Sequence, residues 1–304
     1  MKTIVVLLMD AFRFDHLTKE ITPNLIKISQ DGVLYTNCLS GDTVTRDSMP
    51  YLLCGEPQYL PGVSIMARLK KYGYTSVVVS SNLIVNMYFG QGWAEVVDIR
   101  IEEAVSESNL RVILRKITTG RVFNIGRKIY RKLGRKKFII AYARAKRHFD
   151  IVSSLLEVPA TQFIWCHLMD PHSPYAPVKY MGDPLLLKIH DNYTDSRFGH
   201  RALTPLEIDI LRMAYRTELT EMDEQIGTFY RSVDWSDKIL IITADHGEEL
   251  GDHGKFGHEG DRFFPELQHV PLIVVNGQDR GIVGEDFHHK DFPDLVIEEA
   301  LKSG

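Results

Sequence analysis

The densest group of side chains that could bind a metal or move protons lies between residues 243 and 260. This stretch reads TADHGEELGDHGKFGHEG and places five carboxylates and three histidines within 18 residues. Carboxylate oxygens and imidazole nitrogens together are suitable ligands for a divalent cation. The alternative is a polar loop in which Asp245 caps a helix and His246 makes ordinary hydrogen bonds. Because Asp245 and His246 follow the apolar run 238–242 closely, they are the strongest metal-ligand candidates.

Two other apolar runs end in side chains of the same types. Asp10 follows residues 3–9, and Asp170 and His172 follow residues 162–168. If these runs are parallel strands, their carboxyl ends meet at one edge of the sheet, where such folds bind ligands. A charged carboxylate at the end of a buried strand also needs compensation, which a cation provides. The sequence therefore predicts a shared site at this edge.

A hydroxyl-rich segment, residues 40–48 with the sequence SGDTVTRDS, precedes a helical pattern at residues 49–54. A hydroxyl at the start of a helix meets free N–H groups and the positive end of the helix dipole, which favour negative charge. Ser40, Thr43, Thr45 and Ser48 are therefore candidates for a nucleophile, with helix capping as the alternative role.

The elements that must position these residues are predicted from hydrophobic periodicity. Continuous apolar runs predict strands buried on both faces, and they lie at residues 3–9, 33–36, 75–80, 162–168, 238–243 and 270–275. Helical patterns between them include 23–30, 63–72 and 204–233, the last opened by the capping-box pair Thr204 and Glu207. The alternation predicts an α/β fold with a largely parallel central sheet sandwiched by helices. We expect one catalytic domain, residues 1–304, with a basic helical insertion at about 100–160.

The charge of the chain is unevenly distributed. Residues 111–147 hold 14 of the 36 Lys and Arg residues and no Asp or Glu, although the net charge is −4. Apolar residues in this segment recur roughly as in amphipathic helices. The favoured interpretation is a solvated helical insertion beside an acidic body, and the alternative is peripheral contact with an anionic membrane. No specific nucleic-acid binding is expected, since no recognition module accompanies the charge.

The composition indicates a globular protein in a reducing compartment. The first apolar run, residues 4–9, is too short for a secretory or membrane-spanning segment. Three widely spaced cysteines do not form a disulfide framework. We expect a cytoplasmic protein, with the inner face of the membrane as the alternative location, and the sequence specifies no oligomeric state.

Several short segments, taken in order, resemble the alkaline phosphatase and sulfatase superfamily. They are the first strand ending in Asp10, TPNL at 22–25, GVLYTN at 32–37, DPHSPY at 170–175, DEQIG at 223–227 and DHGEELGDHG at 245–254. The resemblance covers most of the chain outside the basic insertion. It implies an alkaline-phosphatase-like fold and a metal-dependent enzyme that acts on an anionic ester.

Three departures from the sulfatase pattern bear on the reaction. Thr45 stands where sulfatases carry the Cys or Ser that becomes formylglycine, and TRDSM replaces the CxPSR pattern. The resemblance places the same threonine in phosphodiesterases and in phosphoethanolamine and phosphoglycerol transferases, which pass through a phosphothreonine. His258 replaces a common Lys, and Ala11 replaces the second Asp of the opening pair. We therefore favour Zn²⁺ or Mn²⁺ as the cofactor, with Mg²⁺ or Ca²⁺ as alternatives.

The resemblance also implies a role for each candidate residue. One metal is held by Asp10, Thr45, Asp245 and His246, and Thr45 is the nucleophile. His172 and His258 are catalytic candidates that bind phosphoryl oxygens, protonate the leaving group or share a second metal with Asp170. From their positions in the sequence, Arg46 beside Thr45 and Asn82 after the strand at 75–80 are candidates for substrate binding, with a turn role as the equal alternative for Asn82. His167 and His253 are expected to support the ligands, and Glu248, Glu249, Asp252 and Glu259 to be solvated or supporting.

These residues together predict a metal-dependent hydrolase of phosphoric esters, with diesters favoured, that acts through a covalent phosphothreonine. One alternative is a transferase that passes the phosphoryl-linked group to a hydroxyl of a lipid or glycan. A second is a true sulfatase. An alternative of another class is a non-catalytic module that binds polyanions.

Overall fold

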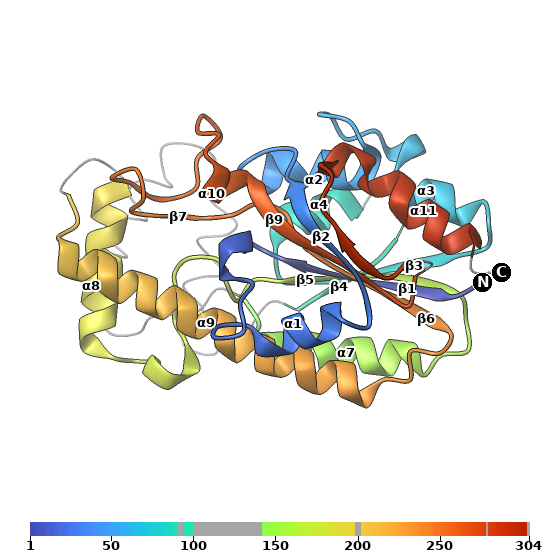
Figure 1. The fold of residues 1–304 in the computed structure, drawn as a ribbon, viewed down its shortest axis with the longest axis horizontal. Coiled ribbons are helices and arrows are strands. Elements are labelled where there is room, and N and C mark those ends of the chain that lie inside the picture. The colour runs from blue at the N-terminus through green and yellow to red at the C-terminus, as the bar shows by residue number, and fades with distance from the viewer. Residues whose placement is uncertain (90–93, 100–141, 198–201, 278, 303–304) are drawn as a thin grey trace, which may run out of the picture.

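The computed structural model describes residues 1–304 except 90–93, 100–141, 198–201, 278 and 303–304 (Figure 1). Its strands are β1 (Thr3–Met9), β2 (Gly32–Leu39), β3 (Thr75–Ser80), β4 (Glu95–Asp98), β5 (Gln162–Leu168), β6 (Lys238–Ala244), β7 (Glu249–Leu250), β8 (Phe256–Gly257), β9 (His269–Val275), β10 (Gly281–Val283) and β11 (Phe287–His288). Its helices of more than three residues are α1 (Pro23–Ser29), α2 (Thr45–Cys54), α3 (Ile65–Lys70), α4 (Leu83–Phe89), α7 (Ala145–Leu156), α8 (Pro184–Arg197), α9 (Pro205–Ser232), α10 (Pro265–Gln268) and α11 (Phe292–Lys302).

The central sheet runs in the order β10-β2-β9-β6-β1-β5-β3-β4, and β11 pairs with β2. The strands β6, β1, β5, β3 and β4 are parallel neighbours, and β9 is antiparallel to both β6 and β2. All residues of β5, and all but the first of β1 and β6, are buried. Because these strands are covered on both faces, their sequences are continuously apolar. The predicted α/β class with a largely parallel sheet is confirmed.

Helices cover both faces of the sheet (Figure 1). One face carries α1, α7 and α9, with α7 packed against β5 and β3. The other carries α2, α3, α4 and α11, with α3 and α4 packed against β3. The helix α2, which begins at Thr45, therefore lies on the side opposite α9.

The longest described helix, α9, has the predicted capping box. The Thr204 hydroxyl accepts from the Glu207 N–H at 3.3 Å, and a Glu207 carboxylate oxygen accepts from the Thr204 N–H at 2.8 Å. Further along α9, the buried carboxylate of Asp223 accepts the backbone N–H groups of Asn24 and Leu25. The segment DEQIG thus holds the first turn of α1 against α9, away from the cluster of metal-ligand candidates.

Among the differences between the structure and the predicted elements, these bear on the site and on the basic segment. Helix α2 begins at Thr45 and not at residue 49, so Thr45 itself is the first helical residue. The strand predicted at 270–275 runs antiparallel to its neighbours. Helix α7, at the end of the predicted basic insertion, packs on the sheet; residues 100–141 lie outside the described residues, so the insertion itself stays a prediction.

Candidate metal centre and its pocket

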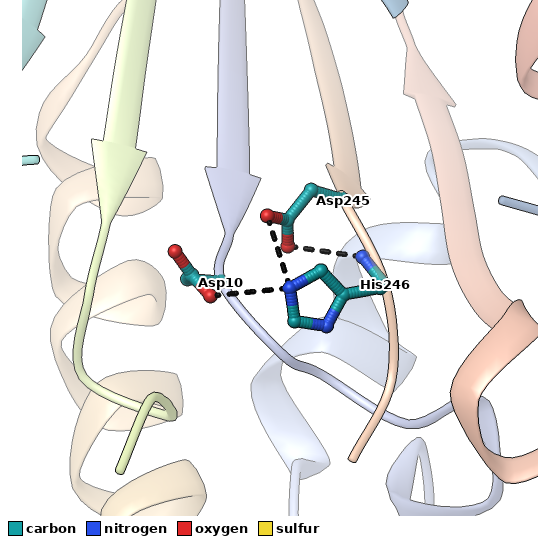
Figure 2. A group of neighbouring side chains, drawn as sticks. All are labelled: Asp10, Asp245 and His246. Atoms are coloured by element: carbon teal, nitrogen blue, oxygen red, sulfur yellow. Dashed lines mark hydrogen bonds and ion pairs between the residues drawn. The ribbon is translucent and has the colours of Figure 1, made fainter. Parts of the chain in front are cut away.

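Asp10 and Asp245 leave the sheet side by side because their strands are paired in register. Met9 of β1 lies opposite Ala244 of β6, so the next residue of each strand emerges at the same edge. His246 follows directly, and the three side chains converge beyond the strand ends (Figure 2). One ligand atom of each lies within 4.8 Å of the others, and all three residues are completely buried. The predicted meeting of Asp10, Asp245 and His246 is therefore present in the structure.

The free atoms of this cluster fit a cation. Within the described part of the chain, Oδ1 of Asp10 and Oδ2 of Asp245 are buried without a hydrogen-bond partner. Nδ1 of His246 lies 2.8 Å from the carbonyl oxygen of Gly247. A carbonyl only accepts, so Nδ1 carries the hydrogen and Nε2 directs its lone pair at the carboxylates. Two carboxylate oxygens and one imidazole nitrogen are thus available as ligands for a divalent metal.

The backbone on either side holds the Asp245 carboxylate in this orientation. Its Oδ1 accepts the N–H groups of Ala11 at 3.1 Å and of His246 at 2.9 Å. Ala11 adopts a left-handed conformation with φ 61°, which is uncommon for a residue with a Cβ and is typical of functional sites. The residue that lacks the expected second carboxylate therefore contributes its backbone N–H to the site.

Thr45 points its hydroxyl at the same cluster from the start of α2. Its Oγ1 lies 3.3 Å from Oδ2 of Asp10 and 3.3 Å from Nε2 of His246. Among the other hydroxyl candidates, Thr43 donates to the carbonyl of Glu259 and Ser48 donates to the carbonyl of Asp245. Ser40 donates to the carbonyl of Asp42. Of the four hydroxyl candidates, Thr45 is therefore the one whose side chain contacts Asp10 and His246.

The pocket beside this cluster has a volume of about 600 Å³ and is lined in part by Thr45, His172 and His258. The rings of His172 and His258 lie 5.1 Å apart, and those of His246 and His258 lie 4.3 Å apart. Nδ1 of His172 faces the carbonyl of Ser173, and Nδ1 of His258 faces the carboxylate of Glu248. In both rings Nε2 is the nitrogen not engaged by these partners.

The charges of the site influence one another strongly. Burial alone would raise the pKa of Asp10, but His172, His167 and His246 outweigh it and lower that pKa far below its usual range. Burial would lower the pKa of His246, but the carboxylates of Asp245 and Asp10 raise it. Asp10 is therefore ionised, as a metal ligand must be.

Several residues that are not among the predicted metal ligands lie close to the cluster of Asp10, Asp245 and His246. His167 was expected to support the ligands, and its Nε2 lies 3.2 Å from Oδ2 of Asp10. Nδ2 of Asn82 lies 3.4 Å from the same oxygen. Glu248 and Glu249 are completely buried, so the alternative of solvated side chains is wrong for both. Their burial could not be anticipated because Glu248 lies in a loop and Glu249 begins the two-residue strand β7, which is too short to show a periodic pattern.

Other candidates lie further from the cluster. Oδ1 of Asp170 accepts the N–H of Ala145 at 3.2 Å and lies 3.7 Å from Nη1 of Arg144. It therefore faces α7, and its role in a second metal site stays a prediction. Arg46 lines the pocket but is exposed and paired with Asp47 at 2.8 Å.

The remaining two expectations concern a histidine and the basic segment. His253 contacts Glu266 at 3.1 Å and stacks on Phe264, away from the metal-ligand candidates. Most of the basic segment 111–147 lies outside the described residues, so its expected membrane contact stays a prediction. Where the structure is described, no helix has the length and apolar character needed to cross a bilayer.

The fold and the site together define the class of protein. A largely parallel sheet with a carboxylate–histidine cluster and a helix-terminal threonine at its edge is the arrangement that the resemblance to the alkaline phosphatase and sulfatase superfamily predicts. The sequence model of the family named Sulfatase matches residues 2–292. The chain therefore belongs to the sulfatase family.

One relative of known sequence matches this chain over a shorter length than the family model does. The Multifunctional alkaline phosphatase superfamily protein PehA of Trinickia caryophylli is 33% identical over 120 residues, which cover 34% of this chain and 22% of that protein. The match thus spans less than a quarter of this relative's length.

Two solved structures show the same fold. The phosphonate monoester hydrolase of Agrobacterium radiobacter is 17% identical, with a TM-score of 0.68 over 99% of this chain and 74% of that chain. The C-terminal periplasmic domain of EcEptC from Escherichia coli, solved in complex with Zn, is 14% identical, with a TM-score of 0.68 over 98% of this chain and 82% of that chain.

Proposed function

We propose that the protein is a metal-dependent hydrolase of phosphoric esters, with diesters preferred, and that Thr45 forms a covalent phosphothreonine. The observation that carries this proposal is the position of the Thr45 hydroxyl, 3.3 Å from both Asp10 and His246. A nucleophile in contact with metal-ligand side chains at a helix N-terminus is suited to attack on an anionic ester.

The residues that would hold the cofactor are Asp10, Asp245, His246 and Thr45. A divalent cation bound there supplies Lewis-acid chemistry, which lowers the pKa of a hydroxyl ligand and neutralises charge on the substrate. We favour Zn²⁺ or Mn²⁺ because an imidazole shares the site with carboxylates and because Ala11 offers no side-chain oxygen. The related EcEptC domain was solved in complex with Zn, which supports the same preference.

The chain's own side chains divide the reaction between them. The Thr45 hydroxyl loses its proton to solvent, its oxygen forms a bond to phosphorus, and the bond to the leaving alcohol breaks. His172 or His258, as an imidazolium with a hydrogen on Nε2 as well as on Nδ1, donates the proton that the leaving oxygen takes up and regains one from the water that attacks next. Water then attacks the phosphothreonine, which frees the Thr45 hydroxyl and releases the monoester. In a transferase an acceptor hydroxyl would replace this water.

Sulfate ester hydrolysis is the second candidate, because the matching family bears the name Sulfatase. The residue at the nucleophile position argues against it. A formylglycine hydrate can expel sulfate by collapsing to the aldehyde, whereas the Thr45 side chain has no such exit. Phosphorus chemistry therefore fits Thr45 better.

The experiment combines elemental analysis of the purified protein with a panel of phosphomonoester, phosphodiester and sulfate ester substrates. We expect bound zinc or manganese and the highest kcat/KM on a phosphodiester. Thr45→Ala should reduce kcat by about a thousandfold or more, as loss of a nucleophile does, while retaining bound metal. Thr43→Ala is the matched control, because Thr43 contacts the carbonyl of Glu259 and not the metal ligands. Equal turnover by Thr45→Ala and the wild-type protein would refute the proposal.

A further inference from the structure

One helix at the mouth of the pocket exposes an apolar surface. Helix α4 has the sequence LIVNMYF and contains no charged residue. Val85 and Phe89 are buried, whereas Leu83, Ile84 and Met87 are 54%, 40% and 73% exposed. Residues three and four apart lie on the same side of a helix, so these exposed side chains form one strip, which we name the α4 apolar strip. Single exposed apolar residues are ordinary, but a contiguous group beside a pocket marks a binding surface.

Two polar contacts fix the α4 apolar strip to the reaction centre. At the start of α4, the Asn82 side chain accepts the N–H of Ile84 at 2.8 Å and reaches Asp10 at 3.4 Å. Near its end, the hydroxyl of Tyr88 donates to the carbonyl oxygen of Arg46 at 2.6 Å. Arg46 is the neighbour of Thr45. The strip is therefore tied at one end to a metal-ligand candidate and at the other to the helix that carries the nucleophile.

The lining of the pocket combines polar and apolar groups. Its polar groups include the hydroxyl of Thr45 and the two histidine rings, and its aliphatic side chains are Val44, Leu83, Ile84 and Met169. Since Leu83 and Ile84 line the pocket and also belong to the α4 apolar strip, the strip adjoins the pocket that holds the Thr45 hydroxyl. Met87 extends the strip by about one helical turn, roughly 6 Å.

We propose that the α4 apolar strip binds an aliphatic chain of the ester, so that the substrate is an amphiphilic phosphodiester of the lipid type. This inference rests on the proposed function, because it assigns the part of the substrate that does not react. The anionic phosphoryl group lies at Thr45 and the two histidines, and the chain lies along Leu83, Ile84 and Met87. A sugar or nucleoside substituent would leave these side chains in contact with polar groups or water.

The consequence is a dependence of catalysis on chain length. Each methylene transferred from water to an apolar surface contributes up to about 0.8 kcal/mol, which is a factor of about four. On a half-open surface we expect about two- to fourfold in kcat/KM for each methylene. The gain should appear mainly in KM, because contacts far from phosphorus stabilise the ground state and the transition state equally. It should level off once the chain passes Met87.

The test uses methyl, butyl and octyl 4-nitrophenyl phosphate with the metal-loaded full chain, below the concentrations at which the esters aggregate. We expect kcat/KM to rise at least tenfold from the methyl to the octyl ester. In Leu83→Ser combined with Met87→Ser, the octyl-to-methyl ratio should fall toward one. Ile282→Ser is the matched control, because Ile282 is 75% exposed on the edge strand β10 and should leave the ratio unchanged.

The outcomes separate this inference from the proposed function. Turnover of the methyl ester without any rise along the series overturns the inference and leaves the proposed function standing. If no diester is turned over, the proposed function fails, and the binding of octylphosphonate relative to methylphosphonate then decides the inference. Equal affinities of these two inert probes would overturn it, and a preference for the octyl probe that the double variant abolishes would support it.

Discussion

The carboxylate of Glu248 is completely buried, and its Oε1 lies 3.1 Å from Nδ1 of His258. Burial would raise the pKa of Glu248, but His258, His172 and His246 outweigh it and lower that pKa. An ionised carboxylate only accepts, so it selects the form of His258 with a hydrogen on Nδ1. Nε2 is then the nitrogen presented to the pocket, and Glu248 acts as a positioning residue for His258.

Substitution of Glu248 tests this role. Glu248→Gln keeps an oxygen that can accept from Nδ1, whereas Glu248→Ala removes it. We expect Glu248→Ala to reduce kcat/KM for a phosphodiester by about 10- to 100-fold, as loss of such supporting partners does, and Glu248→Gln to reduce it less. In a His258→Gln variant, the added substitution Glu248→Ala should lower kcat/KM only slightly further. A full additional loss in that variant would show that Glu248 does not act through His258.

Among the elements, α1 depends on a contact that comes from α9. The Asp223 carboxylate accepts from the Asn24 N–H at 2.9 Å and from the Leu25 N–H at 2.8 Å. Helix α1 needs this outside acceptor, because its N-cap residue, Thr22, makes no side-chain capping hydrogen bond. The two helices are therefore joined through one side chain.

Asp223→Ala should lower the free energy of unfolding by about 2 to 4 kcal/mol, because it leaves buried N–H groups without an acceptor. Urea denaturation, followed by circular dichroism, measures this change. Glu224→Ala is the matched control, since this neighbouring residue of α9 is exposed. A loss no larger than that of Glu224→Ala would contradict the role of Asp223.

The sequence predicts those elements that a short stretch of neighbouring residues is enough to specify. The capping box of α9 needs only Thr204 and Glu207, and the buried strands need only their apolar runs, so both were predictable. The direction of β9 depends on which strands it joins, and pairing between distant strands is not encoded in a local pattern. The start of α2 at Thr45 was missed because Thr45, Asp47 and Ser48 are weak helix formers and Pro50 lies inside the helix.

The same distinction applies to the site. Asp10, Asp245 and His246 were predictable because each follows a buried strand, and parallel strands bring such positions together. The contacts of Asn82 with Asp10 and of Glu248 with His258 join loops whose paths are set by tertiary packing. No spacing in the sequence indicates them.

For the whole molecule, buried histidines couple stability to pH. Burial lowers the pKa of His148 and His190 to about 4 and that of His289 to about 3, from an ordinary value of 6.5. Below pH 6.5 the unfolded chain takes up protons that these folded residues do not. Their stabilising effect is therefore complete above pH 6.5 and is lost as the pH falls toward 4. Glu218 has the opposite effect, since burial raises its pKa from 4.5 to about 7. Between these pH values the folded chain holds a proton on Glu218 that the unfolded chain has released, so this residue favours the folded state as the pH falls.

His148→Gln should make the free energy of unfolding less dependent on pH, because the unfolded variant takes up one proton fewer than the unfolded wild-type chain. Each histidine of this kind costs about 1.6 kcal/mol of stability between pH 6.5 and 5, since the slope rises to about 1.4 kcal/mol per pH unit only below the unfolded pKa. Urea titrations at both pH values give the difference for each variant, whatever its absolute stability. His253→Gln, at an exposed loop position, should keep the wild-type difference. An unchanged difference in His148→Gln would show that His148 is protonated in the folded protein.

The central claim is that phosphorus becomes bonded to Thr45, and the covalent intermediate itself tests it most directly. The metal-loaded protein is mixed with a phosphodiester, quenched in acid during turnover, and digested for mass spectrometry. We predict a peptide that contains Thr45 and carries the phosphoryl monoester group on that residue, absent from Thr45→Ala. Steady turnover with the adduct on Thr43, Ser48 or another residue, or turnover by Thr45→Ala at the wild-type rate, would contradict the account.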